Sequence, residues 1–114
     1  AYTPKEVVLE DEQLVIKKVF GKVSISYSKI EEISYFKKLS WKTIRLFGSG
    51  GLFGWFGIFH VPGIGEVWIY ARRTRDFVFI KADRKYLISP ENPQMFIAAL
   101  KEKLKSRNFR HNFK

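Results

Sequence analysis

Few side chains in this sequence could carry acid–base, metal or nucleophilic chemistry. The histidines are His60, within an apolar stretch, and His111, near the C-terminus, and neither has a partner at the spacing typical of a metal site or a catalytic triad. The chain has no cysteine, which excludes disulfides, thiolate metal sites and a cysteine nucleophile. We therefore interpret His60 as an ordinary strand residue and expect no metal site.

The acidic side chains form two contiguous runs, Glu10-Asp11-Glu12 and Glu31-Glu32. Carboxyl groups that share acid–base catalysis need environments different enough to separate their pKa values. Neighbouring acids in turns or at strand edges are all solvated, so they lack that difference. The sequence therefore predicts no catalytic residue, and we expect a protein that is not an enzyme and uses no cofactor or small-molecule substrate.

The glycines between positions 48 and 65 do not form a nucleotide-binding motif. A P-loop requires Gly-Lys-Ser/Thr, but Gly21-Lys22 is followed by Val23. A dinucleotide-binding pattern begun at Gly48 breaks at Phe53. We interpret these glycines as bulges and turns of a strongly bent sheet, where a positive φ or a close backbone approach is required.

The net charge of +10 is distributed unevenly, because residues 1–34 carry −1 and residues 35–114 carry +11. A basic surface with many aromatic side chains indicates an anionic partner, either a membrane or a nucleic acid. The alternative is that solvated basic turns only keep an apolar domain soluble. The basic residues form three groups: Lys37, Lys38, Lys42 and Arg45 around Trp41; Arg72, Arg73 and Arg75 in one turn; and the C-terminal tail.

Aromatic residues make up 17% of the chain and are concentrated among the glycines. Trp55 and Phe56 have two interpretations there. Alternation along a strand would direct them to opposite faces, where both would belong to the core. In the second interpretation they cap an exposed loop and contact a bilayer interface or a partner.

Most of the chain alternates with the period of two that is typical of strands. The first 38 residues predict a four-stranded antiparallel meander, and about seven strands are expected in all. Further strands are predicted at residues 43–47, 66–71, 77–81 and 86–89.

The period becomes helical after Asn92, a typical N-cap residue followed by Pro93. Phe96, Leu100 and Leu104 then form one apolar stripe. Residues 1–106 are predicted to form a single domain and residues 107–114 a basic flexible tail. The fold class expected is mainly β with one C-terminal α-helix that covers a small barrel or an orthogonal sandwich.

Residues 47–57, 64–71 and 86–96, with the corner at 25–30, resemble the bacterial and archaeal pleckstrin-homology-like (PH-like) domains. The resemblance implies about seven strands in two roughly orthogonal sheets, capped by the helix. It also implies a non-catalytic binding or assembly module, often attached to membrane segments. Eukaryotic relatives that bind phosphoinositides carry basic residues between the first two strands, and this chain has Glu10-Asp11-Glu12-Gln13 there.

We therefore predict a non-catalytic, membrane-proximal PH-like module whose basic turns and tail face anionic lipid. The alternative is a protein-interaction or self-association module that uses a strand edge or a helix-side groove, and a nucleic-acid partner is the least favoured. The expected location is the cytoplasm or the cytoplasmic face of a membrane, including the soluble part of a membrane-anchored protein. The candidate surface contacts are Lys37, Lys38, Trp41, Lys42, Arg45, Trp55, Phe56, Arg72, Arg73 and Arg75.

Overall fold

The structure is a computed structural model that describes the backbone of residues 4–18, 22–49 and 55–112. These residues form nine strands, a short 3-10 turn and one α-helix. In chain order they are β1 (Pro4–Leu9), β2 (Gln13–Lys18), β3 (Lys22–Ser26), the turn Tyr27–Lys29, β4 (Glu32–Lys38), β5 (Ile44–Ser49), β6 (Trp55–Val61), β7 (Gly65–Ala71), β8 (Arg75–Lys81), β9 (Lys85–Ile88) and α1 (Pro93–Asn112).

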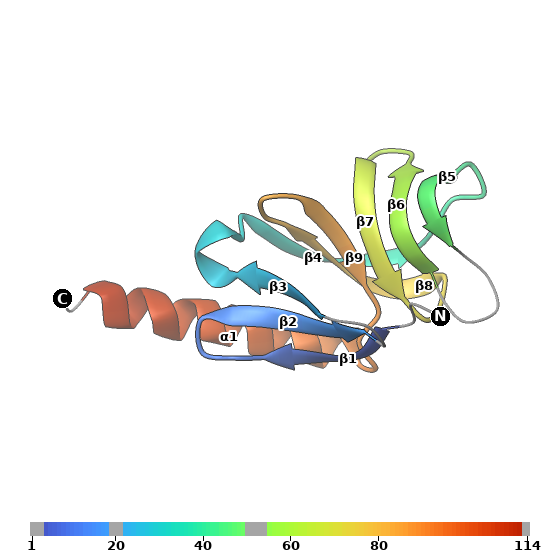
Figure 1. Cartoon of the computed structure of the whole chain (residues 1–114). Coiled ribbons are helices and arrows are strands. Elements are labelled where there is room, and N and C mark those ends of the chain that lie inside the picture. The colour runs from blue at the N-terminus through green and yellow to red at the C-terminus, as the bar shows by residue number, and fades with distance from the viewer. Residues whose placement is uncertain (1–3, 19–21, 50–54, 113–114) are drawn as a thin grey trace.

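The strands form two sheets, one in the order β1-β2-β3 and one in the order β4-β8-β9-β7-β6-β5 (Figure 1). All neighbouring strands are antiparallel except β7 and β9. The predicted four-stranded meander is therefore wrong in its last strand. β4 leaves β3 after the 3-10 turn and pairs with β8, from Glu32 opposite Lys81 to Lys38 opposite Arg75. This pairing places the rings of Phe36 and Phe77 with their centroids 6.2 Å apart.

The six-stranded sheet bends strongly, because its two edge strands are consecutive in the chain. Residues 39–43 connect β4 to β5, and a connection of that length spans at most about 20 Å. The outer strands of a flat six-stranded sheet lie about 24 Å apart. The bend buries one face of the sheet against itself, and all members of that cluster come from β4–β9 and their connections: Phe59, Val61, Val67, Ile69, Ala71, Phe77, Phe79 and Leu87, with Phe36, Leu39, Trp55 and Ile64 at its margin.

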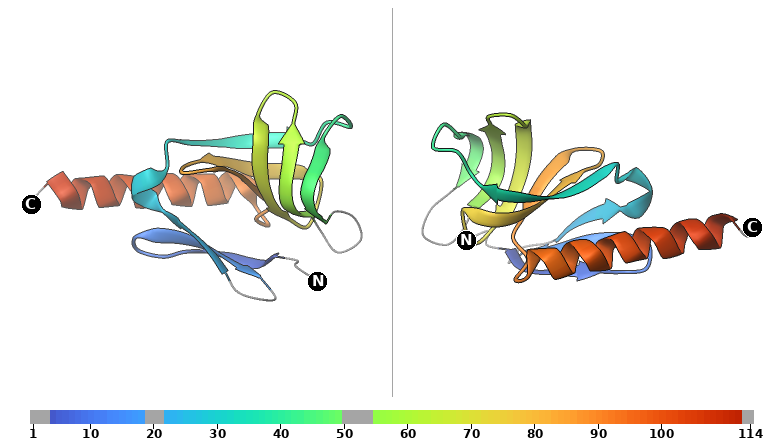
Figure 2. Two further views of the ribbon diagram at one scale, coloured as in Figure 1. Left: turned by 45° about the horizontal axis from the view of Figure 1, so that its top comes forward. Right: turned by 180° about the vertical axis from the view of Figure 1, so that it is seen from behind.

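A second core lies between the other face of this sheet, the three-stranded sheet and α1 (Figure 2). It contains Leu14 and Ile25 from the small sheet, Val78 from β8, and Ile97 and Leu100 from the helix. Two sheets with one C-terminal helix confirm the predicted fold class, a PH-like sandwich or barrel capped by a helix. The sheets hold nine strands where about seven were expected.

The glycines of β5 and β6 permit a backbone contact that other residues would prevent. Gly48 and Gly57 are directly opposite each other, with φ angles of +112° and +127°. A Cβ atom on Gly48 would lie 2.0 Å from the Phe56 carbonyl oxygen, and one on Gly57 would lie 2.1 Å from that of Phe47. The prediction that these glycines serve a close backbone approach in a bent sheet is confirmed at this pair.

α1 begins as predicted and ends later than predicted. The Asn92 side-chain oxygen accepts a hydrogen bond from the Met95 backbone N–H at 3.2 Å, which caps the first turn. The helix passes Ser106 and continues to Asn112. Residues 107–112 are therefore helical rather than a non-periodic tail, and no glycine or proline in them would end the helix. Among the described residues, no helix is long and apolar enough to cross a membrane.

Candidate functional site

Four of the six large apolar side chains that are exposed in the described chain lie within residues 37–47, which we call the β5 end. The connection from β4 to β5 carries Trp41 with 88% of its surface exposed. On β5 itself, Ile44 is 57%, Leu46 55% and Phe47 69% exposed. A folded domain normally buries most side chains of this size, so four within seven positions indicate an interaction surface.

Two features of β5 explain why its side chains stay outside the core. Within the described sheet, β5 is an edge strand that pairs only with β6. The register with β6 shifts between Arg45, which lies opposite Phe59, and Phe47, which lies opposite Ile58. Leu46 is the extra residue of this bulge, so the regular alternation of inward and outward side chains is lost there.

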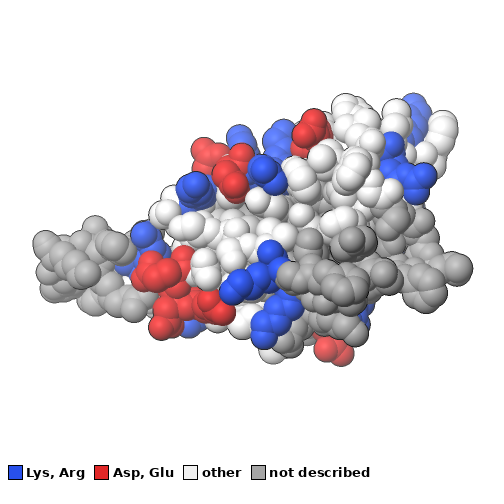
Figure 3. Space-filling view, in the orientation of Figure 1, with Lys and Arg blue, Asp and Glu red and all other residues white. Residues whose placement is uncertain are grey.

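The β5 end is also basic. Lys37, Lys38, Lys42 and Arg45 are all exposed, and the sequence between Glu32 and Glu66 contains no acidic residue. The Lys42 ammonium lies 5.3 Å from the centroid of the Trp41 ring. Among the described side chains, no acid forms an ion pair with any of these four cations. The surface around β5 in Figure 3 accordingly shows basic and uncharged atoms.

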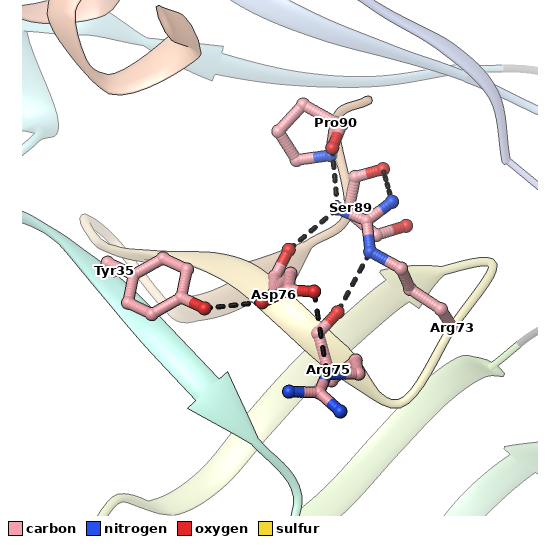
Figure 4. A network of polar contacts seen from close by, with 6 residues as sticks. All are labelled: Tyr35, Arg73, Arg75, Asp76, Ser89 and Pro90. Atoms are coloured by element: carbon pink, nitrogen blue, oxygen red, sulfur yellow. Dashed lines mark hydrogen bonds and ion pairs between the residues drawn. The ribbon is translucent and has the colours of Figure 1, made fainter. Parts of the chain in front are cut away.

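Arg73, one of the predicted surface contacts, is half-buried and forms hydrogen bonds within the fold. Its guanidinium donates hydrogen bonds to the backbone oxygens of Arg75 at 2.9 Å, Asp76 at 2.7 Å, Ser89 at 3.3 Å and Pro90 at 2.6 Å (Figure 4). These bonds join the β7–β8 turn to the segment between β9 and α1. Because its N–H groups donate to backbone oxygens on both segments, the Arg73 side chain helps to hold these segments together.

The other two arginines of this turn are exposed. The backbone N–H of Arg72 donates to the Ser89 hydroxyl at 2.8 Å, and the Arg75 guanidinium lies 3.5 Å from the Asp76 carboxylate. Asp76 adopts a φ of +58° and accepts a hydrogen bond from the Tyr35 hydroxyl, which raises the pKa of that tyrosine. Of the three arginine charges in this turn, that of Arg75 therefore faces an acid of the same turn.

Trp55 and Phe56 lie within β6 rather than at the tip of a loop. Both are half-buried, on opposite faces of the sheet. The Trp55 ring packs on Phe59 with centroids 5.6 Å apart, and the Phe56 ring packs on Tyr70 with centroids 5.4 Å apart. Trp55 packs against one core and Phe56 against the other, in agreement with the interpretation that both belong to the core. Their neighbour Phe53 lies outside the described residues.

The acidic turn between β1 and β2 contacts the basic end of α1. The Arg107 guanidinium lies 2.9 Å from the Glu12 carboxylate, and the Lys103 ammonium lies 3.7 Å from Asp11. The buried Tyr27 hydroxyl donates to the Glu10 carbonyl at 2.5 Å. Burial, with the nearby negative charges of this turn, raises the pKa of Tyr27 to about 12.

A comparison with protein families decides what kind of domain this is. A family model described as bacterial PH domain matches residues 5–104. The chain belongs to the bacterial PH domain family. The match includes both sheets and most of α1. No curated protein and no solved structure matches this PH domain.

PH domains are generally non-catalytic binding modules, so the family directs attention to surfaces rather than to a catalytic centre. In the described part of this PH domain, no group of three histidine, cysteine or acidic residues is placed to hold a metal ion. His60 is exposed on β6, opposite Ile44 and Glu66. A hollow beside the β8–β9 turn is lined by two acids, Glu66 and Asp83, and by three bases, Lys81, Arg84 and Lys85, so most of its charge cancels. The Arg84 guanidinium lies 4.5 Å from the centroid of the Trp68 ring.

The sequence located the basic residues of the β5 end and Trp41 but missed the apolar residues of β5 itself. Ile44, Leu46 and Phe47 were expected to form an ordinary short strand, which would hide at least one face in the core. The absence of acids between Glu32 and Glu66 was a signal that the sequence did contain. The exposure of both faces of β5 depends on the bulge and on the edge position, which no local pattern shows.

Proposed function

We propose that this PH domain is a non-catalytic module that binds an anionic membrane surface through the β5 end. The single observation that carries the proposal is the distribution of charge. The cations of residues 37–45 are gathered at one end with no acid between Glu32 and Glu66, whereas Lys103 and Arg107 of α1 face acids of their own chain. The proposed location is the cytoplasmic face of a membrane, either alone or as part of a membrane-anchored protein.

Electrostatic attraction of this kind is reversible. Each basic residue near an anionic bilayer contributes about 1 kcal/mol, so four of them give about 4 kcal/mol, which corresponds to a dissociation constant near the millimolar range. The attraction decays over a Debye length of about 8 Å at physiological ionic strength. The charges alone therefore predict weak binding that salt removes.

The test is sedimentation with vesicles of phosphatidylcholine, with and without phosphatidylserine. A variant with Lys37, Lys38, Lys42 and Arg45 all replaced by glutamine should bind the anionic vesicles at least about tenfold more weakly than the parent. The matched control removes the same charge from exposed lysines outside the β5 end, namely Lys29, Lys81, Lys101 and Lys105. Equal binding to both vesicle types, or equal losses in the two variants, would contradict the proposal.

A protein partner is the second candidate, and the open edge of β5 favours it. An edge strand can accept an added strand from another chain. Light scattering over a range of concentrations tests self-association, and a strict monomer would count against that version. Retention of labelled oligonucleotides that falls steeply with salt would instead support the least favoured partner, a nucleic acid.

A further inference from the structure

We propose that the β5 end enters the headgroup layer of an anionic bilayer, with Trp41, Ile44, Leu46 and Phe47 as the inserting side chains. This inference rests on the proposed function and deepens it, because it replaces attraction at a distance with a defined contact. It names an edge strand as the membrane-contacting element. The acidic β1–β2 turn stays away from the lipid.

Apolar and basic side chains are combined in one short segment at the β5 end. The four apolar residues are between 55% and 88% exposed, and the cations Lys42 and Arg45 lie among them in the sequence. Tryptophan favours the membrane interface, and lysine and arginine can lay their aliphatic stems along apolar surface while the charge reaches the phosphates. The segment therefore has the composition of an interfacial contact with anionic lipid.

The cations of the β5 end favour a bilayer over a second copy of the chain as its partner. If two β5 edges paired with each other, the pairing would bring the cations Lys42 and Arg45 of both copies to one interface. Like charges that face each other across paired strands are destabilising. An anionic bilayer buries the same apolar side chains and neutralises these charges, so it complements the surface better.

The position of the β5 end within the molecule also favours contact with an anionic bilayer. The described residues are elongated, with principal extents of 46 × 30 × 23 Å. β5 lies toward one end, and the β1–β2 turn lies toward the end where α1 finishes (Figures 1 and 2). A domain that contacts the bilayer through β5 thus holds Glu10, Asp11 and Glu12 away from the anionic surface.

The backbone on the outer edge of β5 limits the depth of insertion. The outer edge of β5 has backbone N–H and C=O groups that no strand of the described sheet pairs. Such groups cannot enter the hydrocarbon core without a large cost, because no water is available there to bond them. They remain hydrated among the headgroups, so the side chains reach the boundary of the acyl region and the strand itself does not.

The chain has no cysteine, so a single introduced cysteine can carry a fluorescent label at a chosen position. The variants are Leu46→Cys and Phe47→Cys, each with an environment-sensitive fluorophore, and the control is Ala98→Cys on the exposed face of α1. On vesicles containing phosphatidylserine, the labels at 46 and 47 should shift to the blue. Quenchers attached near the headgroups should quench them more than quenchers deep in the acyl chains.

A second set of variants removes the apolar side chains and keeps the charge. Leu46→Ser/Phe47→Ser should weaken binding to anionic vesicles at least tenfold and make the remaining binding more sensitive to salt. Met95→Ser is the matched control, because Met95 is 69% exposed on α1, outside the β5 end. All these positions are on the surface, so thermal unfolding should show folded proteins of nearly parental stability.

The outcomes separate the inference from the proposed function. Vesicle binding that depends on the four cations, with no spectral shift at 46 or 47 and no loss in the serine variant, overturns the insertion and leaves the membrane function in place. No binding to anionic vesicles overturns both. A concentration-dependent dimer that the serine substitutions abolish also overturns the insertion, because β5 would then be an interface between copies.

Discussion

The charged side chains at the two ends of this PH domain have different environments. At the β1–β2 turn, the acids meet Lys103 and Arg107 of α1, and the turn is tied down further by the Tyr27 hydroxyl on the Glu10 carbonyl. At the β5 end, the cations have no acid between Glu32 and Glu66 to pair with, and large apolar side chains lie exposed beside them.

The difference shows which features point to function in a domain whose family implies binding rather than catalysis. Charges that are satisfied inside the fold, including the Arg73 guanidinium on four backbone carbonyls, contribute to the architecture. Large apolar side chains left exposed beside unpaired cations mark an interaction site. The net charge of +10 does not separate charges used within the fold from charges left exposed. The contacts of each side chain separate them.

The largest expected effect comes from breaking the backbone contact that bends the β5 end. Gly57→Ala places a Cβ atom against the Phe47 carbonyl at a φ of +127°. We expect a loss of at least about 2 kcal/mol in the free energy of unfolding, or a fall in Tm of roughly 8–16 °C.

Gly63→Ala is the control for this substitution, since Gly63 has a φ of +87° but no atom within 4 Å of the added Cβ. It should cost only the backbone strain, about 1–2 kcal/mol. Equal losses in the two variants would show that the contact between Gly48 and Gly57 does not determine the stability of β5.

The next effect concerns the acidic end and depends on pH. Tyr27→Phe removes the hydrogen bond to Glu10 and should cost about 1 kcal/mol near neutral pH. An unfolded tyrosine has a pKa of about 10, and the folded pKa of Tyr27 is about 12. Because the folded state holds the proton more tightly, this stabilisation is present below about pH 10 and is lost as the pH rises toward 12.

Denaturant unfolding of the parent and of Tyr27→Phe, measured across this alkaline range, checks the sign. The difference in unfolding free energy should narrow between about pH 10 and 12. Other groups titrate in the same range, but they do so in both proteins and cancel in the difference. A gap that widens with pH would contradict the assigned environment of Tyr27.

The smallest effect is expected for the ion pair between Glu12 and Arg107. Both side chains are partly exposed, so a double-mutant cycle of Glu12→Ala and Arg107→Ala should give a coupling of at most about 1 kcal/mol, and it should decrease as salt is added. In the double-mutant cycle, the contributions of the other contacts of Glu12 cancel from the coupling energy. A coupling that does not change with salt would argue against an exposed electrostatic pair.

Local sequence patterns were sufficient where a structural element depends on its own neighbours. Asn92 and Pro93 marked the start of α1 because a cap and the first turn involve only adjacent residues. Short apolar runs located strands near β7, β8 and β9, because consecutive residues on both faces of these strands are buried. The end of α1 was misplaced, since nothing local stops the helix and Arg107 meets Glu12, which is distant in the chain.

The sequence by itself determined the fold class, the family and the uneven charge of this PH domain. Composition and periodicity carry the charge distribution and the fold class without any knowledge of contacts, and the family was indicated by the resemblance of residues 47–57, 64–71 and 86–96. Only the tertiary structure decided that β4 pairs with β8, that Arg73 is used internally and that Leu46 and Phe47 stay exposed. Each of these features depends on which distant parts of the backbone come together. The pattern of side chains along one strand specifies neither its partner strand nor the carbonyl groups that its side chains will contact.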